Sequence, residues 1–296
     1  MDNNDPLGHF RKHFYLKKDV NYMCGNSLGL ASKEAEEEIL NVLQQWKTEG
    51  VNIWHIDKCK YLKYSGNLAE LMAPLVGADK DEIAIANSTT VNIHQMIATF
   101  YKPTRSKFKI LVDDVNFPTD RYAVDGSPAA MYINRRHFSL MPGLPGWYGN
   151  KIDTQFHGLQ IGTPTLLAMA GLEGSLKVFE KAGMEQIRKK SLHITGYMVF
   201  LVENKLKEYG FAVGNPREDR QRGGHVCLEH PEGYRISLVL KERGLVSDFR
   251  EPNVIRLTPA ALYTTYEQVY DLADVLLDIM TTKCYLDYSS KRSLVV

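Results

Sequence analysis

Cysteine is scarce in this sequence, and its spacing excludes several kinds of site. Four cysteines occur in 296 residues, and they are far apart, at Cys24, Cys59, Cys227 and Cys284. No two of them have the Cys-x-x-Cys spacing that structural zinc sites use. We therefore expect no metal, no disulfide framework and reduced thiols, which are typical of a cytoplasmic protein.

An excess of charge of either sign is also absent. Thirty-six basic residues face thirty-five acidic ones, which leaves a net charge of +1. This balance argues against a nucleic-acid partner, because such proteins carry a basic surface. No apolar run is long enough to span a bilayer, and the first five residues are polar and acidic rather than a signal peptide. We expect no membrane partner.

The most informative stretch runs from residue 83 to residue 93. The apolar residues 83–86 predict a buried parallel strand, and residues 87–90, Asn-Ser-Thr-Thr, precede a helix that starts near Val91. The free N–H groups and the dipole of a helix start favour an anion, and threonine hydroxyls add donors. Thr89 and Thr90 are therefore candidates for holding a phosphate group. The alternative is that Ser88 or Thr89 only caps the helix.

A second apolar run, residues 108–113, predicts another strand of the same sheet. The strand–helix–strand order is that of a βαβ unit, and parallel sheets bind ligands at the carboxyl ends of their strands. Phe117 and Asp120 follow such an end. An aromatic ring and a carboxylate there suit a flat heteroaromatic ring with a protonated nitrogen. We therefore predict an α/β fold.

From about Phe211 the composition changes to that of a small α+β unit. Strands are predicted at 225–228, 245–249 and 254–257, with helices at 234–243 and 266–280. Arg256 lies inside the apolar run 254–257, where a guanidinium is costly unless it meets an anion. That anion is either a substrate carboxylate or the partner in a structural salt bridge, and the sequence leaves both open.

Six motifs in order resemble the kynureninase family, and its bacterial members most. They are Gly-Asn-Ser-Leu-Gly-Leu (25–30), Asn-Ser-Thr-Thr-Val-Asn (87–92), Phe-Pro-Thr-Asp (117–120), Gly-Trp-Tyr-Gly (146–149), Ile-Gly-Thr-Pro (161–164) and Asn-Val-Ile-Arg-Leu-Thr-Pro (253–259). Kynureninases are pyridoxal-phosphate (PLP) hydrolases of the aspartate-aminotransferase fold, fold type I. The resemblance implies an N-terminal arm with a substrate loop (1–30), a large PLP-binding domain (31–206) and a small C-terminal domain (207–296).

The resemblance also implies roles for particular residues. Thr89 and Thr90 match positions that hold the cofactor phosphate, and Phe117 matches the ring that stacks on the pyridine, within Phe117-Pro118-Thr119-Asp120. Trp147 and Thr163 match positions that bind the cofactor phosphate and substrate across a subunit interface. Arg256 matches the arginine that pairs with the substrate α-carboxylate, while Asn26 and Ser27 match a loop near the substrate. The implied assembly is a homodimer.

One part of the family pattern is missing from this chain. The family has further strands and helices between the positions that match Val124 and Ser127, including the lysine that binds the cofactor covalently. A shorter piece is missing around His157. No catalytic lysine can therefore be assigned. Lys60-Tyr61-Leu62-Lys63-Tyr64 is similar to the lysine motif but lacks the glycines that follow it, and we interpret it as a solvated helix start. We predict that the complete protein carries an additional internal segment.

The activity implied is hydrolysis of L-kynurenine, or its 3-hydroxy form, to an anthranilate and L-alanine in tryptophan degradation. Two alternatives stay open. One is a catalytically inactive remnant that acts only as a binding protein, which the missing lysine favours. The other is a different PLP enzyme of the same fold, such as a cysteine desulfurase, against which the motifs at 25–30 and 253–259 argue.

Overall fold

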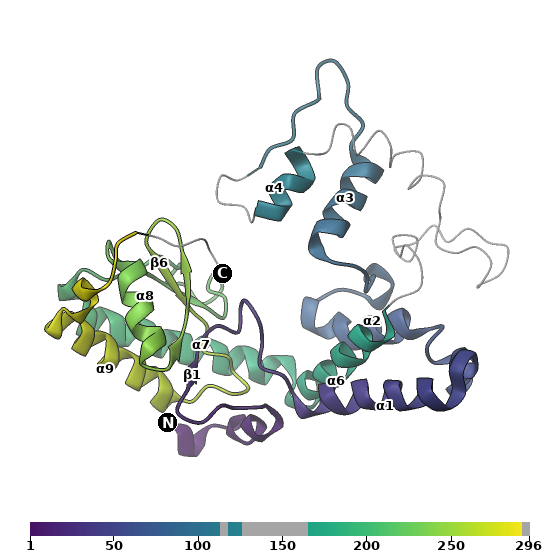
Figure 1. The fold of residues 1–296 in the computed structure, drawn as a ribbon, viewed down its shortest axis with the longest axis horizontal. Coiled ribbons are helices and arrows are strands. Elements are labelled where there is room, and N and C mark those ends of the chain that lie inside the picture. The colour runs from purple at the N-terminus through teal and green to yellow at the C-terminus, as the bar shows by residue number, and fades with distance from the viewer. Residues whose placement is uncertain (113–117, 126–164, 292–296) are drawn as a thin grey trace. The chain divides into compact units, whose positions relative to one another are not determined.

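The computed structural model describes residues 1–112, 118–125 and 165–291, and these divide into two compact units. The first unit combines Met1–Glu36 with Lys177–Val296, and the second is Glu37–Leu176. Both ends of the chain therefore belong to one unit, and the middle of the chain forms the other (Figure 1). The predicted domains, 1–30, 31–206 and 207–296, stay a prediction about the complete family fold.

The first unit is built from short strands and long helices. Its strands are β1 (Asn21–Tyr22), β2 (Ala212–Val213), β3 (Val226–Glu229), β4 (Leu245–Val246), β5 (Asp248–Arg250) and β6 (Val254–Leu257). Its helices are the end of α6 (Leu166–Ala182), α7 (Met184–Leu201), which continues as a π-helix (Val202–Leu206), α8 (Gly233–Glu242) and α9 (Tyr266–Thr282). Short 3-10 helices occupy Asp2–Asn4, Gly8–His13, Lys207–Tyr209 and Cys284–Asp287.

A four-stranded antiparallel sheet organises this unit. Its strand order is β2-β3-β6-β5, and β1 pairs separately and in parallel with β4. Along β6, Ile255 and Leu257 are fully buried, whereas Val254 and Arg256 are only partly buried. This alternation follows from the two-residue period of a strand. Ile255 and Leu257 join the core that α7, α8 and α9 also supply, while Arg256 lies on the opposite face of the sheet.

The N-terminal arm is fastened to the C-terminal helices of the same unit by polar contacts. The Asp2 carboxylate accepts hydrogen bonds from the N–H groups of Tyr266 (2.8 Å) and Glu267 (2.9 Å) at the start of α9. Asp5 forms an ion pair of 2.6 Å with Lys190 of α7, and both side chains are almost fully buried. A carboxylate at a helix start is stabilising, and each partner of a buried ion pair keeps the other from being an uncompensated charge, so the arm is part of the folded unit.

The second unit is mainly helical. It contains most of α1 (Lys33–Glu49), α2 (Tyr64–Val76), α3 (Thr89–Phe100), α4 (Pro118–Asp125) and the start of α6, with 3-10 helices at Gly50–Trp54, Asp57–Cys59 and Lys80–Glu82. Its core gathers apolar side chains from α1, α2 and α6 with those of the loop between α1 and α2. The fully or almost fully buried members include Val42, Ile53, Tyr61, Tyr64, Leu68 and Ala170.

The two strands predicted at the centre of the large domain are not formed in the described residues. Residues 83–86 and 108–112 are irregular, and the last position predicted for the second strand, 113, lies outside the described residues. Leu111 is 98% exposed and Phe108 55% exposed. A strand needs neighbours to pair its backbone groups, and the described residues of this unit contain no strand that could provide them. The prediction of a βαβ unit here is therefore wrong for this chain.

The helices were predicted more successfully. The apolar periodicity of the sequence predicts helices over 62–75, 166–179 and 187–206, in addition to those at 234–243 and 266–280. The first two correspond to α2 and α6, the third to α7 with its π-helical extension, and the last two to α8 and α9. The sequence also predicts a strand at 129–133, and these residues lie outside the described ones. Among the residues described, no helix has the length and apolar character needed to cross a membrane.

Candidate cofactor and substrate sites

The start of α3 has the features of an anion site. Ser88 is the N-cap residue, and its hydroxyl accepts the N–H of Val91 at 3.4 Å. The capping role weighed for Ser88 is thus confirmed, which leaves Thr89 and Thr90 for other partners. Thr89 is exposed and Thr90 is partly buried. Their backbone N–H groups have no hydrogen-bond partner among the described residues, as expected for a first turn.

A second helix start meets the first one through side chains. The Thr90 hydroxyl donates to the Thr119 hydroxyl at 3.2 Å, and Thr119 is the second residue of α4. In Figure 1 the two helices lie side by side at the end of the second unit. Asp120 is partly buried in the first turn of α4. Two helix N-termini and two hydroxyl groups form a donor set that suits a phosphate group, so the residues present fit the phosphate of PLP.

Several predicted cofactor residues fall where the structure gives no description. Phe117, Trp147 and Thr163 lie outside the described residues. Pro118 begins α4, where its missing N–H costs nothing. Of the predicted cofactor residues, the structure therefore brings together Thr89, Thr90, Thr119 and Asp120.

The predicted substrate residue Arg256 is held by a carboxylate across the sheet. Asp248 of β5 is the register partner of Arg256 in β6. The Oδ2 atom of Asp248 accepts hydrogen bonds from Nε (2.9 Å) and Nη2 of Arg256, and also from Nε of Arg250 (3.2 Å). Two guanidinium groups thus share one carboxylate, which leaves one positive charge in excess. The sequence left open whether Arg256 forms a structural salt bridge or binds a substrate carboxylate. The excess positive charge makes the two roles compatible.

Neutral side chains surround this charged cluster. Burial raises the pKa of the Cys24 thiol, with a further contribution from the Asp248 charge. Burial, followed by the positive charge of Arg256, lowers the pKa of His225. Burial also raises the pKa of Cys227, the partner of Arg256 in β3. Since these groups are uncharged at neutral pH, they do not cancel the positive excess.

The predicted substrate loop approaches the end of the same strand. The Asn26 side-chain oxygen accepts the hydroxyl of Thr258 at 2.8 Å, and Thr258 follows β6 two residues after Arg256. The Ser27 N–H donates to the Cys24 carbonyl at 3.1 Å, which closes a turn. Both Asn26 and Ser27 are exposed. A Cβ atom at Gly25 would lie 2.5 Å from the Tyr263 hydroxyl, so a larger residue there would have to displace that buried side chain.

The lysine-rich stretch 60–64 has a structural role. Tyr61 and Tyr64 are buried, and the Tyr64 hydroxyl donates to Glu173 at 2.7 Å. The Lys60 amino group pairs with the same carboxylate at 3.1 Å, and Lys63 is exposed. Our interpretation of this stretch as a solvated helix start is wrong for the two tyrosines, because their rings fill the core of the second unit. Because Lys60 is held in this ion pair, its contacts do not support a catalytic role.

Sequence reasoning missed Asp248 and Thr258. Asp248 lies in a run, Ser-Asp-Phe-Arg, that carries no recognisable site pattern. A hairpin register between 248–250 and 254–256 could have placed Asp248 opposite Arg256. Thr258 lies inside the motif at 253–259, but its contact with Asn26 follows only from the bridge between Cys24 and Thr258, which joins segments far apart in the sequence.

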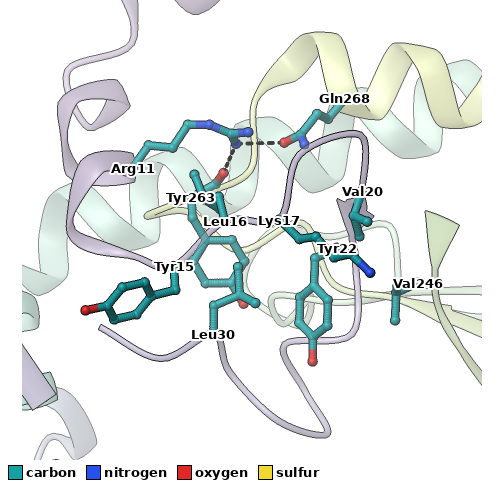
Figure 2. A pocket seen from close by; sticks show the side chains of 10 residues that line it. All are labelled: Arg11, Tyr15, Leu16, Lys17, Val20, Tyr22, Leu30, Val246, Tyr263 and Gln268. Atoms are coloured by element: carbon teal, nitrogen blue, oxygen red, sulfur yellow. Dashed lines mark hydrogen bonds between the residues drawn. The ribbon is translucent and has the colours of Figure 1, made fainter. Parts of the chain in front are cut away.

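A separate pocket of about 330 Å³ lies against the N-terminal arm (Figure 2). Tyr15, Tyr22, Leu30 and Tyr263 supply much of its apolar lining. Arg11 reaches across it to the Tyr263 carbonyl and to the Gln268 side chain, the latter at 2.9 Å. Because Arg256 and Asn26 do not line it, this pocket is distinct from the predicted substrate site.

Comparison with solved structures identifies the fold. The chain resembles the PLP-linked cystine C–S lyase C-DES with a TM-score of 0.68 and 14% identity, over 90% of this chain and 99% of that one. It resembles an apo cysteine desulfurase from Thermococcus onnurineus NA1 with a TM-score of 0.64 and 13% identity, over 93% and 98%. The fold is that of the fold type I PLP-dependent enzymes, as predicted.

Comparison with protein sequences identifies the family. Residues 187–276 match the model of the kynureninase C-terminal domain. The kynureninase of Geobacillus thermodenitrificans is 34% identical over all of this chain and 96% of the relative. That of Bacillus anthracis is 34% identical over 99% of the chain and 96% of the relative. The chain belongs to the kynureninase family of PLP-dependent hydrolases.

The same comparison reveals a large internal difference. The alignment with the Geobacillus kynureninase extends over 412 positions and includes all of this chain, which has 296 residues. About 116 positions of the alignment, the difference between these two lengths, therefore face no residue of this chain. Because the alignment reaches both ends of the chain, these positions lie inside it. A missing internal segment was predicted from the motifs, and the alignment confirms that this chain lacks one.

Proposed function

We propose that the complete protein is a kynureninase that hydrolyses L-kynurenine or 3-hydroxykynurenine, and that this chain holds two of its three functional parts. The parts present are a phosphate cradle, formed by Thr89, Thr90 and Thr119, and a carboxylate clamp centred on Arg256. The part absent is the internal segment that carries the lysine. The observation that carries the proposal is the full-length identity of 34% to kynureninases, together with the fit of the α3 and α4 starts to a phosphate.

The cradle would hold PLP by its phosphate. Helix N–H groups and hydroxyl groups donate hydrogen bonds to phosphate oxygens at any pH near neutral, because neither group has to change its protonation state to do so. When bound, the cofactor withdraws electrons from the substrate carbon that it activates. Asp120 is proposed to lie beside the pyridine ring, and Phe117, Trp147 and Thr163 to complete the pocket. The cradle and the clamp belong to different units, and each is proposed from its own contacts.

The clamp would hold the α-carboxylate of the amino-acid substrate. The excess positive charge of Arg250, Arg256 and Asp248 favours an anion, and a guanidinium binds a carboxylate through two parallel hydrogen bonds. Asn26 and Ser27 are proposed to border this site, because Asn26 contacts Thr258 at 2.8 Å. A homodimer, a cytoplasmic location and a role in tryptophan degradation belong to the same proposal, supported by the family relationship.

The inactive remnant is a second candidate for the 296-residue chain itself, and the missing internal segment favours it. Anthranilate is fluorescent, so activity with kynurenine and added PLP distinguishes the two forms. We expect no anthranilate from the 296-residue chain and turnover from a form in which the segment of the Geobacillus kynureninase is restored. Turnover by the short chain would show that another amine replaces the missing lysine and would refute our division into three parts.

Phosphate binding tests the cradle without any catalysis. Binding of PLP and of inorganic phosphate to the 296-residue chain can be measured by equilibrium dialysis. We expect Thr90→Val to weaken binding about tenfold, since it removes a charge-assisted hydrogen bond. Thr99→Val changes an exposed threonine at the other end of the same helix and is the matched control. Equal binding by both variants would contradict the assignment of the cradle.

A further inference from the structure

The hydrogen bonds of Arg256 are unevenly distributed over its guanidinium group. Asp248 accepts from Nε and Nη2, which form one edge of the group. Nη1 has no hydrogen-bond partner among the residues that the structure describes, and Nη2 has a second N–H. The edge formed by Nη1 and Nη2 is therefore available, and the side chain keeps 28% of its exposure. A carboxylate can bind that edge through two hydrogen bonds.

We propose that Asp248 is a positioning residue, which binds the Nε edge of Arg256 and so presents the Nη1–Nη2 edge to the substrate carboxylate. This inference rests on the proposed function of Arg256 and deepens it. An arginine side chain has many rotamers, and fixing one before the ligand arrives lowers the entropic cost of binding. Asp248 is well placed for this task, since its side chain is 13% exposed and lies on the neighbouring strand.

Arg250 prevents Asp248 from neutralising the clamp. Its Nε donates to the same Oδ2 atom at 3.2 Å, so the carboxylate is shared between two cations. A clamp made of Arg256 and Asp248 alone would have no net charge and little attraction for an anion. With Arg250 included, the cluster keeps one positive charge while the direction of Arg256 stays fixed.

Removing Asp248 distinguishes a positioning role from a purely electrostatic one, because the two roles predict opposite changes in the affinity for a carboxylate. If Asp248 acted only through its charge, Asp248→Ala would remove a repulsive negative charge and strengthen carboxylate binding. If Asp248 positions Arg256, the same change weakens binding although the site becomes more positive. We expect about tenfold weaker binding, comparable to the loss of one charge-assisted hydrogen bond.

The experiment is a titration of the 296-residue chain followed by isothermal titration calorimetry, and by the NMR signal of the Arg256 side chain in every variant that keeps this residue. The ligands are L-kynurenine and its amine analogue without the α-carboxylate. Asp248→Ala should weaken kynurenine binding about tenfold and leave binding of the amine analogue unchanged. A general loss of structure would affect both ligands alike. Asp278→Ala is the matched control, since it removes an exposed carboxylate that pairs with Arg243 at 2.6 Å.

A second variant covers the case in which Asp248→Ala does not fold. Asp248→Asn keeps the shape and one acceptor oxygen, and it should weaken kynurenine binding by less than the alanine variant. Unchanged or tighter kynurenine binding in the aspartate variants would overturn the positioning role and leave the clamp intact. No response of wild-type Arg256 to kynurenine, or full binding by Arg256→Met, would instead overturn the proposed function of the clamp together with this inference.

Discussion

Replacing Lys190 by methionine would test how firmly the N-terminal arm is held. The Lys190 amino group lies 2.6 Å from the Asp5 carboxylate, and the two side chains are only 4% and 3% exposed. Solvent screening is therefore small. Asp5 also accepts the N–H of Leu7 at 3.0 Å, so the carboxylate cannot leave its place without breaking the arm's own structure.

The expected cost follows from what the substitution leaves behind. Lys190→Met buries an unpaired carboxylate, and the loss of one partner of a buried pair typically costs about 3–5 kcal/mol. Replacing both residues, Asp5→Asn with Lys190→Met, removes the unpaired charge and should recover most of that loss. The exposed pair of Arg220 and Glu218, which are 2.8 Å apart and 82% and 59% exposed, is the control. Its disruption should cost less than about 1 kcal/mol.

Hydrogen exchange is a suitable assay, because Trp46 and Trp54 lie in the second unit and their fluorescence does not report on the arm. Amides of the arm and of α7 should exchange about 100-fold to 4,000-fold faster in Lys190→Met, at tenfold for each 1.4 kcal/mol. Exchange as slow as in the wild type would refute the conclusion that this ion pair holds the arm.

Three further predictions each concern one residue. Gly25→Ala should destabilise the first unit because the new methyl group meets the Tyr263 hydroxyl, whereas Gly29→Ala, with open space around it, should not; equal unfolding midpoints would contradict this. His230 accepts the Glu232 N–H through Nδ1 at 3.0 Å, and burial lowers its pKa. The unfolded chain therefore binds the proton first, and stability should fall as the pH decreases through about 6.5. Urea unfolding should show this slope flattened in His230→Asn, and an unchanged slope would exclude His230 as its source. Leu111→Lys should change the stability of this chain by less than about 0.5 kcal/mol, because Leu111 is 98% exposed. In a form with the internal segment restored it should be clearly destabilising, and equal thermal shifts in the two forms would contradict a sheet at this position.

The helices could be predicted from the sequence because they depend on local information. Ser88 and Thr265 are capping residues at the starts of α3 and α9, and the apolar stripes of α8 and α9 have the helical period. The antiparallel strands of the first unit could be predicted equally well, since β5 and β6 form a hairpin within a dozen residues. Each of these elements finds its partners inside the chain.

The central strands could not be predicted reliably because a parallel strand depends on distant partners. Residues 83–86 and 108–112 have the composition of buried strands, but the described residues around them form no sheet. The motifs at 87–92 and 117–120 coincide with the starts of α3 and α4, since helix starts need only local sequence, and the phosphate cradle stays a proposal. Asp248 was missed because its role comes from the cross-strand register with Arg256 and not from a motif.

The most direct test of the account is the intact mass of the protein purified from its natural source. This chain has a mass of 33.6 kDa. Scaling that mass from 296 residues to the 412 aligned positions gives about 47 kDa for a protein with the internal segment. We predict the larger mass, together with release of anthranilate from kynurenine. A natural protein of 33.6 kDa would contradict the proposed kynureninase and would favour the inactive remnant.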